Sequence, residues 1–385
     1  MKILIVRNYP NYMAIGKNST YNIQELGLAS ALVREGHTCD IVFWIKDKEK
    51  SITYQVPRSD GMIVIYYKKA KTFLKNAIYD IDNLIGKYDI IQSCEYNQLQ
   101  SLIFAKKFPE KTVVYHGQYY GKENKKYNIW CKCFDLFGLK SYKKNRTFFI
   151  TKSMLAKEYL ENKELDASHI FALGVGMNRD TLENREHNQS DVCTAIEEIE
   201  ELEADIKLLY VGEFMPRRHL KFMGDVVCEL KKKDKDCKLI MIGKSNNEYG
   251  KSVKEYFESN DLNENVYYAE CIEQRYLSRV YQACTAFLFP STYEIFGMVL
   301  MEAMYFGLPV ISCKNGGSTM LIKDGINGFV INELDVVKWA EKIIQIKEKD
   351  VTEISMNARN TILKNFTWDA LVSQFIQVYE KRLDR

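Results

Sequence analysis

Two glutamates stand eight residues apart in the segment FPSTYEIFGMVLMEAM, where an apolar run meets a helix-forming run. Glu294 precedes the predicted helix and Glu302 lies within it. The helix is expected to begin near Gly297, so the backbone N–H groups of Phe296, Gly297 and Met298 would point outward with the helix dipole behind them. This arrangement is suited to binding a diphosphate.

The separation of the two glutamates limits the chemistry that they could do. Eight residues of helix place them on the order of 12 Å apart, whereas the carboxyl groups of a glycosidase pair are separated by roughly 5 to 9.5 Å. The two carboxylates are therefore expected to bind different parts of one extended ligand, and a sugar nucleotide is such a ligand. The alternative is a pair of solvated glutamates at the end of a helix.

A second candidate site lies in the segment YVGEFMPRRHL. Gly212 ends an apolar run, and Arg217 and Arg218 come just before the next predicted helix. A guanidinium binds phosphate oxygens well, whereas the carboxylate of Glu213 would repel a diphosphate. Glu213 is therefore expected to point away from the ligand, with an ion pair to Arg217 or to the preceding acidic linker, residues 179–205, as the alternative.

The segment TVVYHGQ places His116 at the end of another apolar run. A histidine there could contact a ligand, but it is equally consistent with an ordinary hydrogen-bonded residue beside Gly117. The two Asp-x-Asp strings, at 80–82 and 234–236, do not end an apolar strand, so the sequence predicts no metal site. It also lacks a Walker loop and the GxGxxG and GxSxG motifs.

The elements that must position these residues are expected to be alternating strands and helices. A chain of 385 residues favours two domains. The clearest helix is expected in NIQELGLASALVREGH, with Leu26, Ala29, Leu32 and Val33 on one face. Apolar β-branched runs form two series: 2–6, 39–44, 62–67, 89–93, 112–116 and 148–151, then 206–212, 237–243, 265–270, 285–291, 309–312 and 328–331. Each series predicts a parallel sheet covered by helices.

The predicted fold class is therefore α/β, with two Rossmann-like domains that face each other across a ligand-binding cleft. The first domain is expected at 1–178 and the second at 206–365. An acidic linker or peripheral helix is expected at 179–205.

The E-x7-E motif with its internal FG, followed by EAM, GLPVI and paired glycines, resembles the donor site of the family 4 retaining glycosyltransferases (glycosyl transferases group 1), which have the GT-B fold. The resemblance implies that Glu302 binds the ribose hydroxyls, that Glu294 binds hydroxyls of the transferred sugar, and that the amides at 296–298 bind the diphosphate. It also implies that His116 contacts the transferred sugar at the reacting centre. The last segment, 366–385, resembles the family's terminal helix, which returns to the first domain.

The turn at Gly212 resembles the family's phosphate-binding sequence G-R-x-x-P-x-K-G, with differences. Glu213 stands in the place of the arginine, Arg218 in the place of the lysine and His219 in the place of the last glycine. The resemblance implies that Arg218, with Arg217 beside it, supplies the positive charge at the diphosphate.

Other donor-binding segments of the family have weaker counterparts. The first strand-to-helix loop holds only Gly16 where the family has a glycine-rich stretch. The main chain near Cys271 and Ile272 is expected to contact the nucleobase. Asn178 and Met320 stand where the family has Asp and Glu.

The implied reaction is the transfer of a hexosyl-type sugar, with retention, from a nucleoside-diphosphate sugar to a glycan or lipid-linked acceptor in cell-surface polysaccharide synthesis. The catalytic residues would be His116, Glu294 and Arg218. No cofactor or metal is expected besides the sugar nucleotide itself. Two alternatives stay open: a sugar-nucleotide epimerase or hydrolase on the same fold, and a catalytically altered protein that binds sugar nucleotides or a membrane surface.

Charge is distributed unevenly along the chain. Residues 1–180 contain 28 basic and 18 acidic side chains, whereas residues 181–385 contain 26 and 33. Within 101–150, 11 basic residues accompany 3 acidic ones and several aromatic side chains. This region predicts contact with an anionic membrane surface, with an ordinary solvated lysine-rich face as the alternative. No nucleic-acid partner is predicted.

No apolar run approaches the roughly 18 residues that would span a bilayer, and the ten cysteines are scattered as in a reducing compartment. The expected location is the cytoplasm, including peripheral attachment to the inner face of the cell membrane.

Overall fold

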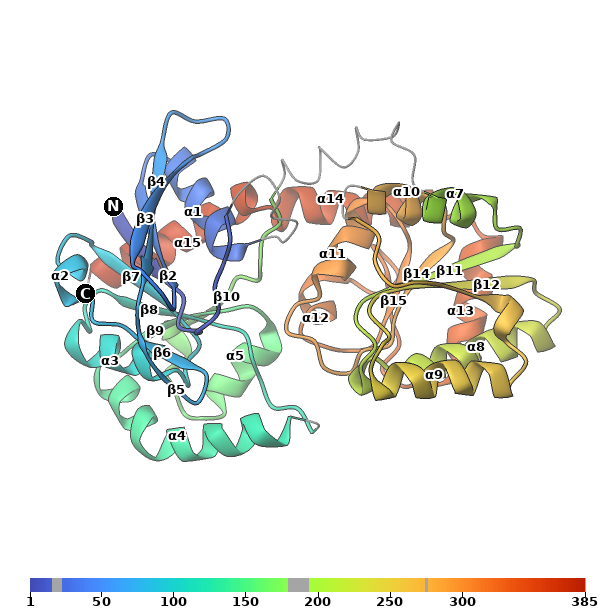
Figure 1. Ribbon diagram of the computed structural model, residues 1–385, viewed down its shortest axis with the longest axis horizontal. Coiled ribbons are helices and arrows are strands. Elements are labelled where there is room, and N and C mark those ends of the chain that lie inside the picture. Colours follow the sequence, from blue (N-terminus) through green and yellow to red (C-terminus); the bar gives the residue numbers. More distant parts are fainter. Residues whose placement is uncertain (16–22, 123, 179–193, 274–275, 385) are drawn as a thin grey trace. The chain divides into compact units, whose positions relative to one another are not determined.

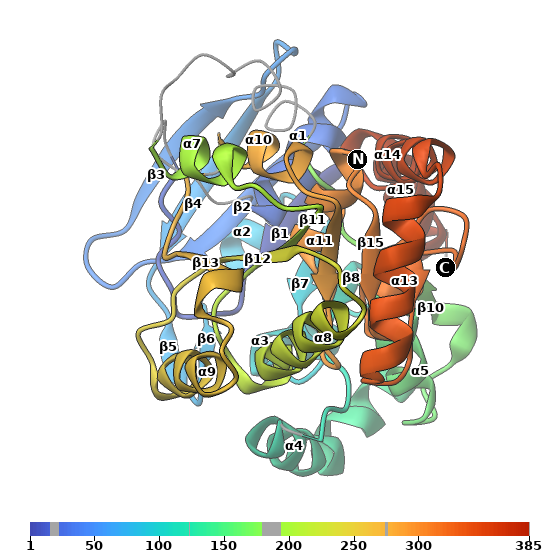
Figure 2. The same cartoon turned by 90° about the vertical axis from the view of Figure 1, so that its right-hand side faces the viewer.

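The computed structural model describes residues 1–15, 23–122, 124–178, 194–273 and 276–384. The chain divides into two compact units, which Figures 1 and 2 show from two directions. Unit 1 comprises Met1–Asn178 and Phe366–Arg385, and unit 2 comprises Arg179–Asn365. Each unit is an α/β arrangement built around one large sheet.

Unit 1 contains an eight-stranded sheet in the order β10-β9-β8-β7-β1-β2-β4-β3. Neighbouring strands are parallel except at the edge, where β3 runs antiparallel to β4. A separate hairpin pairs β5 with β6. The strands are β1 (Lys2–Val6), β2 (Thr38–Trp44), β3 (Lys50–Gln55), β4 (Met62–Lys68), β5 (Lys71–Phe73), β6 (Asn76–Ile78), β7 (Ile90–Cys94), β8 (Thr112–His116), β9 (Phe148–Thr151) and β10 (Ile170–Ala172).

The sequence predicted six of these strands and missed β3, β5, β6 and β10. The missed strands lack a long apolar run. In β3 the side chains alternate between exposed and half-buried, as expected of an edge strand, and each of the other three spans only 3 residues.

The helices of unit 1 are α1 (Gln24–Arg34), α2 (Asp82–Ile85), α3 (Leu99–Lys107), α4 (Lys125–Lys144), α5 (Met154–Glu161) and α15 (Trp368–Leu383), with a 3-10 turn, η1, at Ala167–His169. The last helix, α15, packs against α1 and belongs to unit 1. The prediction that the terminal helix returns to the first domain is confirmed.

The predicted apolar face of α1 was too narrow. Leu26 is only half-buried, whereas Leu28 and Ala31 are almost completely buried. A Cβ on Gly27 would lie 2.2 Å from Trp368 Nε1, so α15 approaches α1 where α1 has no side chain. Because α1 is covered by both the sheet and α15, it buries more than one face.

Unit 2 contains a six-stranded parallel sheet in the order β13-β12-β11-β14-β15-β16. Its strands correspond to the six apolar runs of the second series, and most of their side chains are fully buried, as in a sheet covered on both faces. The strands are β11 (Ile206–Val211), β12 (Cys237–Ile242), β13 (Val266–Ala269), β14 (Ala286–Phe289), β15 (Val310–Ser312) and β16 (Phe329–Val330).

The helices of unit 2 are α7 (Thr194–Glu201), α8 (Leu220–Lys232), α9 (Glu248–Ser259), α10 (Leu277–Gln282), α11 (Met298–Tyr305), α12 (Ser318–Leu321), α13 (Val336–Glu348) and α14 (Thr352–Asn365), with 3-10 turns η2 (Pro216–Arg218) and η3 (Asn263–Asn265). Of the segment predicted as an acidic linker, only the part from Thr194 onward is described. There α7 buries Ile196 and Ile199, and Glu200 forms an ion pair of 2.6 Å with Arg279.

In both sheets the strand order reverses at one point. The reversal lies between β1 and β7 in unit 1 and between β11 and β14 in unit 2. Ligands of open α/β sheets bind at the carboxyl ends of the strands beside such a reversal. Among the helices described, none is both long and apolar enough to cross a membrane.

Candidate functional site

Two glycines bring the loops after β11 and β12 close together. Gly212 and Gly243 directly follow these neighbouring strands, and both adopt a φ of 153°. A Cβ on Gly243 would lie 1.9 Å from the Gly212 carbonyl oxygen, so no side chain fits there. The Gly212 N–H donates to the Ile242 carbonyl at 2.8 Å. The two turns are therefore held together at the carboxyl edge of the sheet.

Two arginines of the η2 turn converge on one carboxylate that follows β14. Arg217 Nη1 lies 2.9 Å and Arg218 Nη1 2.8 Å from Glu294 Oε2. Arg217 also donates to the carbonyl of Tyr293 at 2.8 Å, and Arg218 donates to Ser291 Oγ at 3.2 Å. The loops after β11 and β14 are thus cross-linked where the strand order reverses.

Arg218 retains one unused donor. Its Nε is buried and has no hydrogen-bond partner within the described ranges. The guanidinium lies over the ring of Phe289, with 5.3 Å between Cζ and the ring centroid, and 12% of the side chain is exposed. Leaving a buried N–H of a charged group unsatisfied is unfavourable. An oxyanion placed at Nε would therefore be bound strongly.

Glu213 and His219, the two residues singled out in the sequence of this turn, lie in different settings. His219 adopts the left-handed conformation, with φ 51° and ψ 46°, which glycine adopts readily and other residues seldom do. Its Nε2 lies 2.9 Å from Thr292 Oγ1, on the loop that carries Glu294. Glu213 is exposed. Among the described residues the carboxylate partner of Arg217 is Glu294, so the alternative ion pair between Glu213 and Arg217 is not formed.

Helix α11 begins beside this cluster. Gly297 is its N-cap residue, with φ 79°, and its carbonyl accepts from the N–H groups of Leu300 and Met301 at 3.0 and 3.2 Å. The amides that precede Leu300, including that of Met298, therefore have no carbonyl within the helix to bond. Phe296 is buried and anchors the start of the helix to the core. This N-terminus is a suitable place for an anion.

The segment after β15 supports the start of α11. A Cβ on Gly317 would lie 1.8 Å from the Phe296 carbonyl oxygen, and the Gly316 N–H donates to the Glu294 carbonyl at 3.0 Å. Asn315 is fully buried, and its Oδ1 accepts from the Gly317 N–H at 3.0 Å. The paired glycines therefore allow one backbone to lie directly against the other.

Glu302 lies farther along α11. It is buried, and its Oε2 accepts from the Tyr281 hydroxyl at 3.3 Å. The Tyr281 ring stacks on Phe306 with 5.5 Å between centroids. Cys271 and Ile272 follow β13 on another loop, where Cys271 is exposed and Ile272 is buried. Of the predicted site residues in unit 2, Arg217, Arg218 and Glu294 are thus in direct contact. Glu302 and the loop after β13 lie elsewhere in the same unit.

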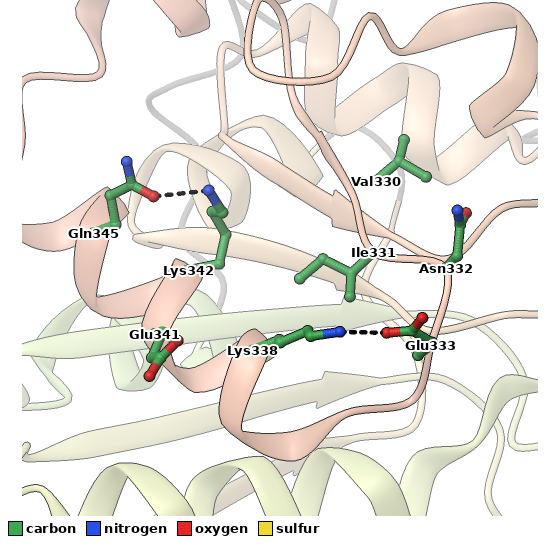
Figure 3. A pocket seen from close by; sticks show the side chains of 8 residues that line it. All are labelled: Val330, Ile331, Asn332, Glu333, Lys338, Glu341, Lys342 and Gln345. Atoms are coloured by element: carbon green, nitrogen blue, oxygen red, sulfur yellow. Dashed lines mark hydrogen bonds and ion pairs between the residues drawn. The ribbon is translucent and has the colours of Figure 1, made fainter.

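A separate hollow of unit 2 is drawn in Figure 3. It is lined by Val330, Ile331, Asn332, Glu333, Lys338, Glu341, Lys342 and Gln345. Lys338 Nζ lies 2.5 Å from Glu333 Oε2, and Lys342 donates to Gln345 Oε1 at 2.7 Å. Its lysines are therefore engaged by neighbouring side chains, and none of the predicted site residues lines it.

In unit 1 the carboxyl ends of three neighbouring strands bring together Glu95, His116 and Lys152. His116 Nδ1 lies 2.6 Å from Glu95 Oε2, which also accepts from the Gly117 N–H at 3.1 Å. Lys152 Nζ lies 4.0 Å from Glu95 Oε1. Burial by itself would raise the pKa of Glu95, but the charges of His116 and Lys152 and the Gly117 N–H lower it to about 2. Glu95 is therefore an ionised carboxylate that holds His116.

His116 is completely buried, and its Nε2 has no hydrogen-bond partner in the described part of the chain. Tyr96 packs edge-on against the imidazole, with 5.1 Å between ring centroids. Because Glu95 engages Nδ1, Nε2 is the ring nitrogen that remains for a ligand.

Sequence reasoning missed Glu95, Lys152 and Asn8. Asn8 follows β1, and its Nδ2 donates to Ser93 Oγ at 2.8 Å, at the strand-order reversal of the first sheet. A signal was present, because each of these polar residues stands within two positions of the end of an apolar strand. Gly16, the remaining predicted contact, lies outside the described residues.

Comparison with known proteins relates the second half of the chain to a known protein family. Residues 194–365 match the family model described as Glycosyl transferases group 1. The D-inositol 3-phosphate glycosyltransferase of Corynebacterium diphtheriae is 29% identical over 178 residues, which cover 45% of this chain and 42% of that protein. The match thus spans less than half of that relative's length.

Solved structures resemble the chain over nearly its whole length. A glycosyltransferase from Rickettsia africae has a TM-score of 0.72 at 18% identity, covering 100% of this chain and 99% of that one. HepE from Anabaena, solved in complex with UDP and glucose, has a TM-score of 0.66 at 15% identity, covering 99% of this chain and 100% of that one. Likeness at this level of identity shows the fold.

Residues 194–365, which lie in unit 2, thus match the glycosyl transferases group 1 family, and the chain as a whole has the two Rossmann-like units of the GT-B fold. The predicted fold class is confirmed, and the match of residues 194–365 agrees with the family predicted from the sequence motifs.

Proposed function

We propose that this protein is a retaining glycosyltransferase that moves a hexosyl-type sugar from a nucleoside-diphosphate sugar to a glycan or lipid-linked acceptor. The observation that carries the proposal is the convergence of Arg217 and Arg218 on Glu294, with a buried and unused donor on Arg218. This cluster adjoins the N-terminus of α11. Two guanidinium groups and a helix N-terminus at one sheet edge suit a diphosphate.

In the proposed donor site, unit 2 binds the nucleotide sugar. The amides of Phe296, Gly297 and Met298 bind the diphosphate, and Gly212 lets the ligand approach the backbone. Arg218 stabilises the charge that develops on the leaving diphosphate. One such donor stabilises a transition state by roughly 2.7 to 4 kcal/mol. With these groups in place the reaction requires no metal ion.

The remaining donor contacts use the other predicted residues. Glu302 binds the ribose hydroxyls and Glu294 binds hydroxyls of the transferred sugar. Arg217 orients the carboxylate of Glu294, to which it is bonded. The main chain at Cys271 and Ile272 contacts the nucleobase.

Unit 1 is the acceptor-binding domain in this proposal. His116 Nε2 hydrogen-bonds a hydroxyl of the transferred sugar while Glu95 holds Nδ1. Gly16, which lies outside the described residues, is proposed as a further donor contact. The acceptor hydroxyl attacks from the face that the diphosphate leaves, so the configuration of the sugar is retained.

The relatives suggest where to begin with substrates. HepE was solved with UDP and glucose, so UDP-glucose is the first donor to test. We assign the reaction to cell-surface polysaccharide synthesis, in the cytoplasm or at the inner face of the cell membrane, where lipid-linked acceptors are presented.

Thermal unfolding with a panel of nucleoside diphosphates and their sugars tests the donor site. A ligand at 100 times its Kd stabilises the folded state by roughly 2.7 kcal/mol. One nucleotide should stabilise the protein selectively, and Glu302→Ala should abolish this effect. The control Glu255→Ala, which changes an exposed glutamate of α9, should preserve it. Absence of stabilisation by every nucleotide would refute the donor site.

Turnover of the stabilising sugar nucleotide then separates the transferase from its rivals. A transferase consumes the donor faster when an acceptor is added. An epimerase or hydrolase acts on the donor alone, and a binding protein does neither. Turnover should also persist in a chelator, and a requirement for added magnesium would contradict the metal-independent mechanism.

A further inference from the structure

Helix α4 is attached to unit 1 along one face. Phe134 and Tyr142 are buried in a core cluster of this unit, and the Tyr142 hydroxyl donates to the Tyr96 carbonyl at 2.6 Å. Trp130 Nε1 donates to the Asn97 carbonyl at 3.0 Å. Both ribbon views place α4 at the periphery of its unit (Figures 1 and 2). The opposite face of this 20-residue helix is exposed.

Three residues form a row along the outer face of α4. Ile129, Cys133 and Leu136 are spaced four and three residues apart, which places them on one side of a helix. Ile129 is 63% exposed and Leu136 is 87% exposed, and Cys133 is exposed as well. Phe137, close to this row, is 47% exposed. A group of large apolar side chains left in water marks an interaction surface.

Lysines flank this apolar row on both sides. At about 100° of rotation per residue, Lys125 and Lys132 lie on one side of the row, Lys126 and Lys144 lie on the other, and Lys140 lies in line with it. Within the part of the chain that the structure describes, no carboxylate lies at ion-pair distance from any of these five lysines.

The other charged side chains of α4 are paired. Lys143 Nζ lies 2.7 Å from Glu164 Oε2. Asp135, the acidic residue of this helix, is bound by Lys163. The outer face of α4 therefore combines an apolar row with five lysines whose charge is not neutralised by those acids.

We propose that the outer face of α4 binds an anionic lipid bilayer. Each lysine near an anionic surface strengthens binding roughly fivefold, and Ile129 and Leu136 would enter the boundary between headgroups and acyl chains. Lysine side chains are long enough to reach the headgroups while an adjacent apolar row is buried. A nucleic acid fits this surface less well, because its phosphates would cover the apolar row without an apolar partner for it.

This inference deepens the proposed function. It rests on that function in one respect, the lipid-linked acceptor, which a membrane would present. Its physical basis is separate from the donor site, because α4 belongs to unit 1 and the donor residues belong to unit 2.

Co-sedimentation of the full chain with vesicles tests the proposal. Vesicles of phosphatidylcholine mixed with phosphatidylglycerol should bind the protein, whereas phosphatidylcholine alone should not, and added salt should release it. Lys132→Gln combined with Lys140→Gln should weaken binding roughly 25-fold. Leu136→Ser should weaken it at least about tenfold. Failure of the unaltered protein to bind the anionic vesicles would overturn the proposal.

Control variants test whether the surface is specific. Lys232→Gln combined with Lys233→Gln removes the same charge from the exposed end of α8. Met356→Ser removes a side chain of α14 that is 54% exposed. Both variants should bind anionic vesicles fully, and an equal loss in these controls would overturn the assignment to α4. Retention on heparin without vesicle binding would also overturn it, in favour of a polyanion partner.

Nucleotide stabilisation of the same variants separates the two proposals. The doubly altered Lys132 and Lys140 protein should be stabilised by the nucleotide as strongly as the unaltered chain. If vesicle binding fails while this stabilisation is normal, the membrane inference falls and the donor site stands. If vesicle binding is intact and no nucleotide stabilises the protein, the donor site falls and the membrane inference stands.

Discussion

The positive charge at the proposed diphosphate-binding turn, residues 212–219, does not depend on the residue that follows Gly212. Glu213 stands where related turns have arginine, yet its side chain is exposed. Arg217 brings a second guanidinium to Glu294 beside that of Arg218. Two positive groups therefore share one carboxylate, and the cluster keeps a net positive charge that suits a diphosphate.

Arg218→Ala is expected to weaken nucleoside diphosphate binding roughly 10- to 100-fold, because a hydrogen bond to a charged group contributes about 1.5 to 3 kcal/mol. Arg218→Lys should restore only part of this affinity, since lysine keeps the charge but lacks the buried Nε donor. Isothermal titration calorimetry measures both effects. Arg58→Ala, in unit 1, is the control and should bind normally. Unchanged affinity in Arg218→Ala would contradict the role given to this residue.

Because of Glu95, the free energy of unfolding of unit 1 should decrease in acid. The pKa of Glu95 in the folded protein is lowered to about 2, below the value of about 4.3 in an unfolded chain. The stabilisation from this carboxylate is therefore fully present above the unfolded pKa and is lost as the pH falls toward 2. The shift corresponds to on the order of 3 kcal/mol.

Urea unfolding between pH 5 and pH 3 measures this dependence. Glu95→Gln should lower the free energy of unfolding at neutral pH, because it leaves His116 and Lys152 without their carboxylate partner. In this variant the free energy of unfolding should also decrease less between pH 5 and pH 3. Glu110→Gln removes an exposed glutamate of unit 1 and should keep the slope of the unaltered protein. If the free energy of unfolding of Glu95→Gln fell with pH as steeply as that of the unaltered protein, Glu95 would not be the source of the pH dependence.

At the scale of elements, the start of α11 is held in position by residues 315–317, which follow the neighbouring strand β15. The backbone of Gly316 and Gly317 touches the backbone of the Glu294 loop, and buried Asn315 holds this contact together. The segment after β15 therefore positions the proposed diphosphate amides without being part of them. A substitution there should disturb binding through geometry alone.

Gly317→Ala is expected to destabilise unit 2 by about 1 to 3 kcal/mol and to lower nucleotide affinity, because the new Cβ would lie 1.8 Å from the Phe296 carbonyl oxygen. Chemical unfolding and calorimetric titration measure the two effects. Gly86→Ala is the control, since its Cβ would meet no atom within 4 Å and its φ of −55° suits alanine. That control should be neutral or stabilising by about 0.4 to 1 kcal/mol. Normal affinity in Gly317→Ala would refute the supporting role.

At the scale of the whole molecule, the C-terminal helix α15 packs against residues 1–178 and is part of unit 1. The Trp368 N–H donates to the Met177 carbonyl at 3.0 Å, and Arg34 Nε donates to Asp369 Oδ1 at 2.8 Å. The Tyr379 hydroxyl donates to Gln92 at 2.6 Å. Unit 1 therefore cannot reach its native packing from residues 1–178 alone.

Trp368→Ala is expected to destabilise unit 1 by about 3 to 5 kcal/mol, because it removes a large buried side chain from between α15 and α1. Hydrogen exchange followed by mass spectrometry should show faster exchange in peptides of β1, α1 and β2. Peptides of β11 and α11 should keep their protection. Leu383→Ala, on the exposed end of α15, should change neither unit, and equal effects in both units would contradict this assignment.

Much of the fold could be predicted from local sequence. Strands buried on both faces appear as apolar runs, and the residues after β14 predict the start of α11 because a helix N-terminus is specified by a few consecutive residues. The short strands β5, β6 and β10 could not be predicted in this way. Three residues do not make a periodic pattern, and their pairing depends on neighbours that are distant in the chain.

The sequence by itself determined the two α/β units, the family resemblance and the identity of the donor-site candidates Arg218, Glu294 and Glu302. Only the tertiary structure decided that both arginines share Glu294, that Glu95 holds His116, and that α1 is buried on more than one face. These contacts join residues that are far apart along the chain, as Arg34 and Asp369 are by 335 positions. Local periodicity carries no information about such pairs, because they form only when the strand order and the returning helix bring them together.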